Sequence, residues 1–272
     1  MHQKHAPDSQ EPQEEIRKPV SNAEINRELT VLRRLFTLAI KNGKLMTRPP
    51  IELLPEGPPR SGFFEREDID AVCAHLPDAL QPVVRFAFVT GWRISEVLHL
   101  TWDRVDFAGR GDVRLQHGQS KTGEPRRFPM TTELRRLLEE QQKLKKRTEH
   151  TTDEIITRVF FRLVAKGRGG EKHPKPIKSF AKAWAHACQA AGCPGRIPHD
   201  LRRSAIRTFV RQGISEHVAM ALSGHKTASV FRRYDIVSSS DLEAAAQKLD
   251  APAVPNKTGE RRVAKVRKFR PR

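Results

Sequence analysis

The stretch TGWRISEV, residues 90–97, decides the predicted fold of the middle of the chain. On its N-terminal side, residues 83–87 are largely apolar and follow helical spacing, and on its C-terminal side Val97 to Leu100 continue an apolar face. Gly91 interrupts this pattern, because glycine readily ends a helix. The stretch therefore predicts two consecutive helices, with Arg93 at the junction between them.

A β-hairpin is predicted after these helices. Val113 and Leu115 alternate with polar residues, and so do Phe128 and Met130. Between the two runs lies KTGE, residues 121–124, a sequence typical of a short turn. Because alternation with period two is the pattern of a strand that buries one face, these runs predict one small antiparallel sheet.

The remaining apolar patterns are helical, with apolar residues at intervals of three and four. They lie at residues 22–42, 69–76, 133–147, 180–191, 202–211, 215–223, 227–235 and 241–249. Gly167 to Gly170 lies in a long polar stretch and is interpreted as a surface loop, since no strand and helix flank it as they flank a phosphate-binding loop. The predicted fold class is therefore mainly α with a small antiparallel β-sheet (α+β).

The composition indicates a partner that carries negative charge. The chain has 272 residues, with 50 Lys and Arg against 32 Asp and Glu, which gives a formal net charge of +18. Such a balance is typical of proteins that bind nucleic acid. Ribosomal proteins and proteins that bind membrane surfaces share it, so the charge alone names only the class of partner.

Several classes of protein are excluded by what the sequence lacks. No stretch approaches the roughly 20 apolar residues that a membrane helix requires, and residues 1–20 have no apolar run typical of a signal peptide. The three cysteines form no framework of paired disulfides, which fits a reducing compartment. Neither of the glycine-rich motifs of nucleotide-binding proteins occurs, which argues against a nucleotide-driven motor.

Composition divides the chain into four segments. Residues 1–20 are polar and lack periodicity, which predicts disorder. Residues 21–60 contain one helical pattern followed by a proline-rich linker. Residues 61–250 hold most of the apolar patterns and are predicted to form the main domain. Residues 251–272 form a tail with eight basic residues against one acidic residue, which predicts a disordered segment able to contact a polyanion.

Two motifs resemble the signature of the tyrosine recombinases, the phage integrase family. TGWRISEV resembles the first signature motif of that family, and HDLR at residues 199–202 with LSGH at residues 222–225 resembles the second. The resemblance runs from about residue 64 to residue 249. It implies a tyrosine-recombinase-like catalytic domain over residues 61–250.

The resemblance also implies six residues that act together on a DNA phosphodiester. Tyr234 follows His225 by nine positions and would attack the phosphorus, becoming joined to the 3′ phosphate. Lys121, in the predicted turn, resembles the family's mobile lysine. No cofactor and no metal ion is implied, because cationic side chains replace the metal. The implied catalytic residues are Arg93, Lys121, His199, Arg202, His225 and Tyr234 (nucleophile).

The chemistry of strand cleavage suits these residue types. The guanidiniums of Arg93 and Arg202 can hold the non-bridging phosphate oxygens and stay charged at any working pH. Lys121 can give a proton to the departing 5′ oxygen, and His225 can donate to the same phosphate oxygens. His199 can serve as the base that takes the proton of the nucleophile.

Taken singly, these residues have structural explanations, because an arginine on a basic helix is usually solvated and a tyrosine at helical spacing usually belongs to the core. Glu96 is interpreted as structural, paired with an arginine. Zinc binding is not predicted, since the spacing of His186, Cys188, Cys193 and His199 fits no standard finger.

The partners follow from the resemblance. They are double-stranded DNA, a homo-tetramer on that DNA and accessory DNA-bending factors, with no membrane. Residues 22–42 resemble the last helix of the family's core-binding domain, so residues 21–60 represent a partial core-binding helix and a linker. Helix 241–249 would dock onto a neighbouring protomer or pack within its own chain. The expected location is the bacterial cytoplasm, associated with DNA.

The predicted function is that of a site-specific DNA recombinase or integrase from a phage or mobile element, working through a covalent 3′-phosphotyrosine. Two alternatives stay open on the sequence. One is a non-catalytic DNA-binding integrase remnant or regulator, and the other is an enzyme like a type IB topoisomerase. The three differ in whether DNA is bound, relaxed or joined at two defined sites.

Overall fold

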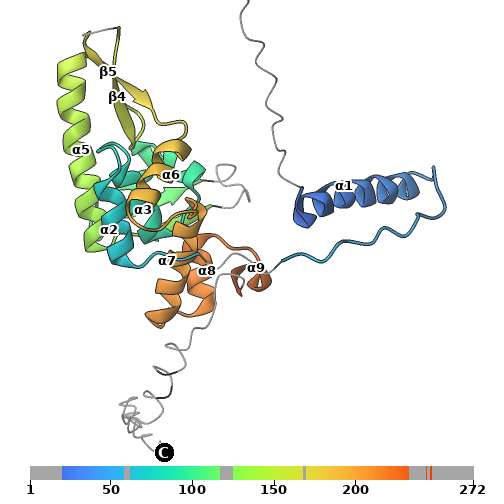
Figure 1. The fold of residues 1–272 in the computed structure, drawn as a ribbon. Helices are drawn as coiled ribbons and strands as arrows, with labels where there is room; N and C mark the ends of the chain where they lie inside the picture. Colours follow the sequence, from blue (N-terminus) through green and yellow to red (C-terminus); the bar gives the residue numbers. More distant parts are fainter. Residues whose placement is uncertain are drawn as a thin grey trace, which may run out of the picture. The chain divides into compact units, whose positions relative to one another are not determined.

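The computed structural model describes residues 20–57, 62–116, 125–167 and 170–232, together with Glu243 and Ala246 (Figure 1). The chain separates into two compact units, residues 1–61 and residues 62–272. The residues of the predicted disordered ends, apart from Val20, lie outside this description, as do most residues of the predicted helix 241–249.

The first unit is one helix with a returning extended segment. Helix α1 (Asn22–Lys41) begins at Ser21, whose side chain accepts a hydrogen bond from the amide of Glu24. The amide side chain of Asn26 is buried, and it donates to the carbonyl oxygen of Leu54 at 2.8 Å while accepting from the amide of the same residue at 2.8 Å. Asn26 thus fixes the extended segment along the helix.

The second unit is mainly helical. Its core is apolar, because each helix carries the apolar stripe that the sequence predicts and turns it inward. The helices are α2 (Arg66–Ala74), α3 (Gln81–Thr90), α4 (Ile94–Leu98), α5 (Thr132–Thr152), α6 (Ala181–Ala190), α7 (His199–Arg211), α8 (Glu216–Ser223) and α9 (Ala228–Arg232), with a short 3-10 helix, η1 (Trp102–Arg104).

Helix α3 occupies the centre of this unit. Phe86 is fully buried on it and contacts the rings of Trp92 and Phe160 edge-on, with centroids 5.7 and 5.4 Å apart. Pro82 at the start of α3 suits a first helical turn, where no amide hydrogen is needed. The predicted break after Thr90 is confirmed, because Gly91 ends α3 with a φ of 65°.

The predicted hairpin is confirmed and is part of a three-stranded antiparallel sheet. Strand β2 (Asp112–Leu115) pairs with β3 (Arg126–Pro129), and the register places Val113 opposite Phe128 and Leu115 opposite Arg126. Strand β1 (Val105–Asp106) adds to the other edge of β2. With two residues, β1 is too short to show an alternating pattern in the sequence.

The predicted single sheet is wrong, because the described residues form a second one. Strand β4 (Phe161–Ala165) and strand β5 (Lys172–Pro176) make an antiparallel hairpin around the glycine-rich run, and Figure 1 shows it beside α5. The sequence KHPKP of β5 is polar and contains two prolines, so nothing in it resembles a strand. Pairing with β4 produces the strand.

The fold class is mainly α with small antiparallel sheets, as the sequence predicts. Among the residues that the structure describes, no helix is long and apolar enough to cross a membrane.

The end of α3 generates a prediction about stability. A Cβ added at Gly91 would lie 3.0 Å from the Cβ of Ala205 on α7, whereas one added at Gly213, after α7, would meet nothing within 4 Å. Both glycines have positive φ, so alanine at either position costs about 1–2 kcal/mol. We expect Gly91→Ala to lose about 1–3 kcal/mol more than Gly213→Ala, because it also overpacks the contact with α7. Urea unfolding measures both, and equal losses would contradict the close approach.

Candidate active site

Four of the six predicted catalytic residues lie in the described part of the chain, and helix ends carry most of them. They are Arg93 at the N-cap of α4, His199 and Arg202 in the first turn of α7, and His225 just after α8. The other two, Lys121 and Tyr234, fall outside the described residues.

Arg202 is anchored by the ends of two other helices. Its side chain is buried, and Nη1 donates to the carbonyl oxygen of Gly91 at 2.7 Å and to that of Ser223 at 2.6 Å. These carbonyls end α3 and α8, where the aligned peptide dipoles concentrate negative charge. The acceptors compensate the buried positive charge and fix the orientation of the guanidinium.

His225 contacts the second terminal nitrogen, Nη2, of the same guanidinium. Its Nε2 lies 2.8 Å from Nη2 of Arg202, and its Nδ1 lies 2.8 Å from Oγ of Ser223. Because a guanidinium only donates hydrogen bonds, Nε2 is the acceptor and the ring is neutral. Burial, together with the charges of Arg202 and Arg93, lowers the pKa of His225 to about 3.

Arg93 lies at the junction that the sequence predicts, and Glu96 holds it there. The carboxylate of Glu96 accepts from the amide of Arg93 at 2.9 Å and from its Nη1 at 3.0 Å. The predicted pairing of Glu96 with an arginine is therefore confirmed. The side chain of Arg93 is 24% exposed, whereas that of Glu96 is 3% exposed, so the guanidinium can reach a ligand while its partner stays inside.

A third arginine, which the sequence analysis missed, completes this group. Arg126, the first residue of β3, is buried, and its Nη2 lies 2.7 Å from Oε2 of Glu96. Its Nη1 donates to the carbonyl oxygen of Ser223, the acceptor that Arg202 also uses. The alternation of the predicted strand could have indicated its burial, because residues 126 and 128 lie on the same face of the strand and Phe128 points inward.

His199 is the exposed member of the group. The loss of water around the part of its ring that packs against protein lowers its pKa, and the charges of Arg202 and Arg203 lower it further. A histidine with a lowered pKa is neutral near pH 7 and is able to accept a proton.

The electrostatics of the site favour an anion. Among the described residues, Arg93 and Arg126 share the carboxylate of Glu96, and Arg202 is held by backbone carbonyl oxygens, so the three guanidiniums carry more positive charge than Glu96 compensates. Burial would raise the pKa of Glu96, but the charge of Arg126 and the hydrogen bond from the backbone amide of Arg93 outweigh it, and the pKa is lowered. No cluster of His, Cys, Asp or Glu within these residues is arranged to hold a metal ion.

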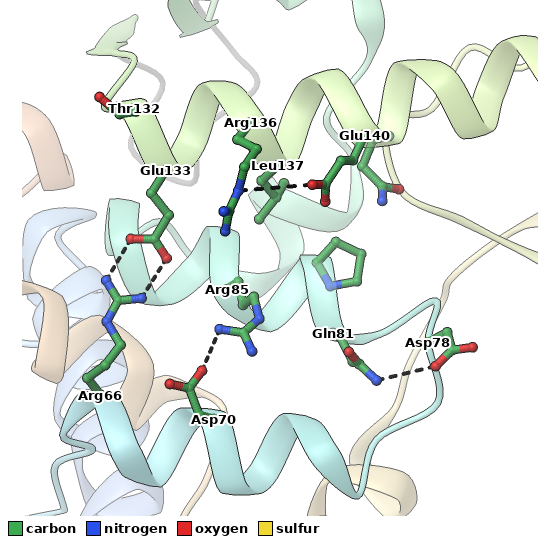
Figure 2. Close-up of a pocket in the computed structure, with 12 residues that line it drawn as sticks. Arg66, Asp70, Asp78, Gln81, Arg85, Thr132, Glu133, Arg136, Leu137 and Glu140 are labelled. Carbon is green, nitrogen blue, oxygen red and sulfur yellow. Dashed lines mark hydrogen bonds and ion pairs between the residues drawn. The ribbon is translucent and has the colours of Figure 1, made fainter.

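A separate polar hollow of about 870 Å³ lies between α2, α3 and α5, and Figure 2 shows that its charges are paired with one another. Arg66 makes a bidentate pair with Glu133, with both distances 2.6 Å, and Arg85 lies 2.6 Å from Asp70. None of the predicted catalytic residues lines this hollow. Because its arginines are paired with carboxylates, this hollow lacks the excess positive charge of the group around Arg202.

Comparison with known proteins gives similarity over most of the chain. The integrase of Salmonella phage P22 is 24% identical over 246 residues, covering 88% of this chain and 61% of the integrase. The shufflon-specific DNA recombinase of Escherichia coli is 23% identical over 246 residues, covering 86% of this chain and 55% of the recombinase. The chain thus spans about three fifths or less of the length of these relatives.

The fold has a counterpart among solved structures. The Tn1549 transposon integrase in complex with circular intermediate DNA superposes with a TM-score of 0.60 at 16% identity, over 84% of this chain and 79% of the integrase. The model of the phage integrase family matches residues 64–240, which include all six predicted catalytic residues. The chain belongs to the phage integrase family, the tyrosine recombinases.

Proposed function

We propose that this chain is a site-specific DNA recombinase that breaks and rejoins DNA through a covalent 3′-phosphotyrosine on Tyr234. The observation that carries the proposal is the buried guanidinium of Arg202, which the ends of α3 and α8 orient beside His225 within a site of excess positive charge. A phosphodiester that gains negative charge during cleavage is the ligand that such a site stabilises best.

Cleavage and rejoining require no nucleotide as an energy source, because each step exchanges one phosphate ester bond for another. The Tyr234 oxygen attacks the phosphorus, a phosphotyrosine bond forms, and the bond from phosphorus to the 5′ oxygen breaks. His199 accepts the proton of the tyrosine, in keeping with its lowered pKa, and Lys121 gives a proton to the departing 5′ oxygen. A 5′ hydroxyl from the exchanging strand then attacks the phosphotyrosine and restores the DNA backbone.

The two arginines have different tasks. Arg93, partly exposed at the start of α4, contacts the non-bridging oxygens directly. Arg202 is held rigidly, so little reorganisation is required as charge develops on the phosphate. His225 accepts a hydrogen bond from Arg202 and, by this contact, helps to orient it.

Double-stranded DNA is the proposed partner, and a homo-tetramer on two DNA sites is the proposed assembly, with accessory DNA-bending factors as further partners. The net charge of +18 supports binding to DNA. Residues 61–250 would be the catalytic domain, residues 21–60 a partial core-binding helix and linker, and residues 251–272 a tail that strengthens binding to any DNA. The proposed location is the bacterial cytoplasm.

The decisive test of the proposal is a covalent-adduct assay. The protein is mixed with labelled, nicked duplexes taken from DNA that flanks its own gene, then denatured and analysed on a gel. We expect an adduct with the wild type and none with Tyr234→Phe, because phenylalanine lacks the attacking oxygen. DNA binding without any adduct, on duplexes that cover both flanks, would favour a non-catalytic integrase remnant.

Replacing either catalytic arginine by lysine should separate chemistry from binding. We expect Arg93→Lys and Arg202→Lys each to slow cleavage at least about 100-fold while DNA affinity stays nearly unchanged, because lysine keeps the charge and loses the planar fork. The matched control is Arg211→Lys at the exposed end of α7, where the side chain pairs with Glu65. Near-normal cleavage by either variant would refute the role of that arginine.

The neutral state of His225 predicts acid sensitivity of the fold. With a folded pKa of about 3 against about 6.5 in the unfolded chain, the unfolded state alone takes up the proton between these values. Stability is therefore lost as the pH falls through this window and is unaffected by this group above it. We expect the wild type to lose about 2 kcal/mol more than His225→Gln between pH 7 and pH 5. Urea unfolding at both pH values measures this, and parallel losses would contradict a buried neutral ring.

A further inference from the structure

Arg126 is a buried cation that the proposed chemistry does not use. We propose that Arg126 is a positioning residue that sets both catalytic arginines, Arg93 through the carboxylate of Glu96 and Arg202 through the carbonyl oxygen of Ser223. This inference rests on the proposed function, because it assigns a further residue to the same reaction.

The contacts of Arg126 point in two directions. On one side its Nη2 lies 2.7 Å from Oε2 of Glu96, whose other oxygen lies 3.0 Å from Nη1 of Arg93. On the other side its Nη1 donates to the carbonyl oxygen of Ser223, which also accepts from Nη1 of Arg202 at 2.6 Å. Arg126 therefore shares one acceptor with each catalytic arginine: the Glu96 carboxylate with Arg93 and the Ser223 carbonyl oxygen with Arg202.

The surroundings of Arg126 hold its plane in one orientation. The guanidinium carbon lies 4.9 Å from the ring centre of Trp92, and the Trp92 indole donates to the carbonyl oxygen of Leu222 at 3.2 Å. The guanidinium thus lies over the face of an indole ring that is itself tied to the end of α8. Lysine has one charged nitrogen, so it cannot contact Glu96 and the Ser223 carbonyl oxygen through two nitrogens held in one plane.

Charge explains why a cation is needed at the position of Arg126. Glu96 is buried and contacts Arg93, and a carboxylate with a single, partly exposed partner would be poorly compensated. Arg126 supplies the second positive charge from the interior. Arg93 then keeps part of its guanidinium accessible for a phosphate, because it does not have to neutralise Glu96 alone.

The position of Arg126 in the chain extends this role. It begins β3, five residues after Lys121, and β3 enters the three-stranded sheet directly at Arg126, opposite Leu115. The contacts of Arg126 with α4 and α8 therefore fix the start of the strand that follows the segment with Lys121.

The test compares Arg126→Lys with Arg127→Met, the next residue of β3, whose side chain is 69% exposed and pairs with Asp112. Single-turnover cleavage of a nicked duplex is measured at saturating DNA, beside the dissociation constant. We expect Arg126→Lys to cleave about 100-fold more slowly with an unchanged dissociation constant, as a displacement near 1 Å of a catalytic group would produce. We expect Arg127→Met to cleave like the wild type. Near-normal cleavage by Arg126→Lys would overturn the proposal.

A second variant guards against loss of folding. Glu96→Gln combined with Arg126→Met removes both buried charges, so no uncompensated ion remains, and the glutamine oxygen can still accept from Arg93. We expect this double variant to fold and to remain about 100-fold slow in cleavage. Cleavage at the wild-type rate would show that the pair only fills the core.

A readout without DNA separates this inference from the proposed function. Side-chain NMR signals of the Arg93 and Arg202 guanidiniums report their hydrogen bonds in the free protein. If the wild type forms no covalent adduct, the proposed function fails. Displaced signals of both arginines in Arg126→Lys would still support the positioning role, and unchanged signals would overturn it.

Discussion

The carbonyl oxygen of Ser223 accepts hydrogen bonds from two buried guanidiniums, those of Arg126 and Arg202. This arrangement exists only because α8 ends at this residue and leaves its carbonyl without a helical partner. Gly224 follows with a φ of 74°, which turns the chain so that His225 reaches Arg202. The rest of the site is assembled around this helix end.

The interior of the second unit supports that arrangement with apolar packing. Helices α3 and α7 lie side by side, and Gly91 allows the end of α3 to approach Ala205 closely enough for its carbonyl to meet Arg202. Because protein interiors are closely packed, these helix ends cannot shift independently. The same contacts that stabilise the fold therefore hold the guanidinium in place.

Charge is distributed so that the interior is compensated and the surface of the site stays positive. Glu96 pairs with Arg126 on the inside and with Arg93 toward solvent, and its lowered pKa keeps it ionised. Helix-end carbonyls, which carry no full charge, compensate Arg202. The site thus retains its attraction for an anion, which a second carboxylate would have cancelled.

Local signals were enough to predict the α-helices that the structure describes, the β2–β3 hairpin, the break at Gly91 and the family, because apolar periodicity, glycines and short motifs each involve only nearby residues. The sequence also indicated that Glu96 pairs with an arginine. The pairing of β4 with β5 appears only in the tertiary structure, since a polar segment with two prolines becomes a strand through its neighbour alone. The tertiary structure also selected Arg126 among 50 basic residues, because burial beside Glu96 and Ser223 joins segments about 30 and 97 positions away along the chain. Such contacts leave no local pattern, and their energies depend on which groups the fold removes from water.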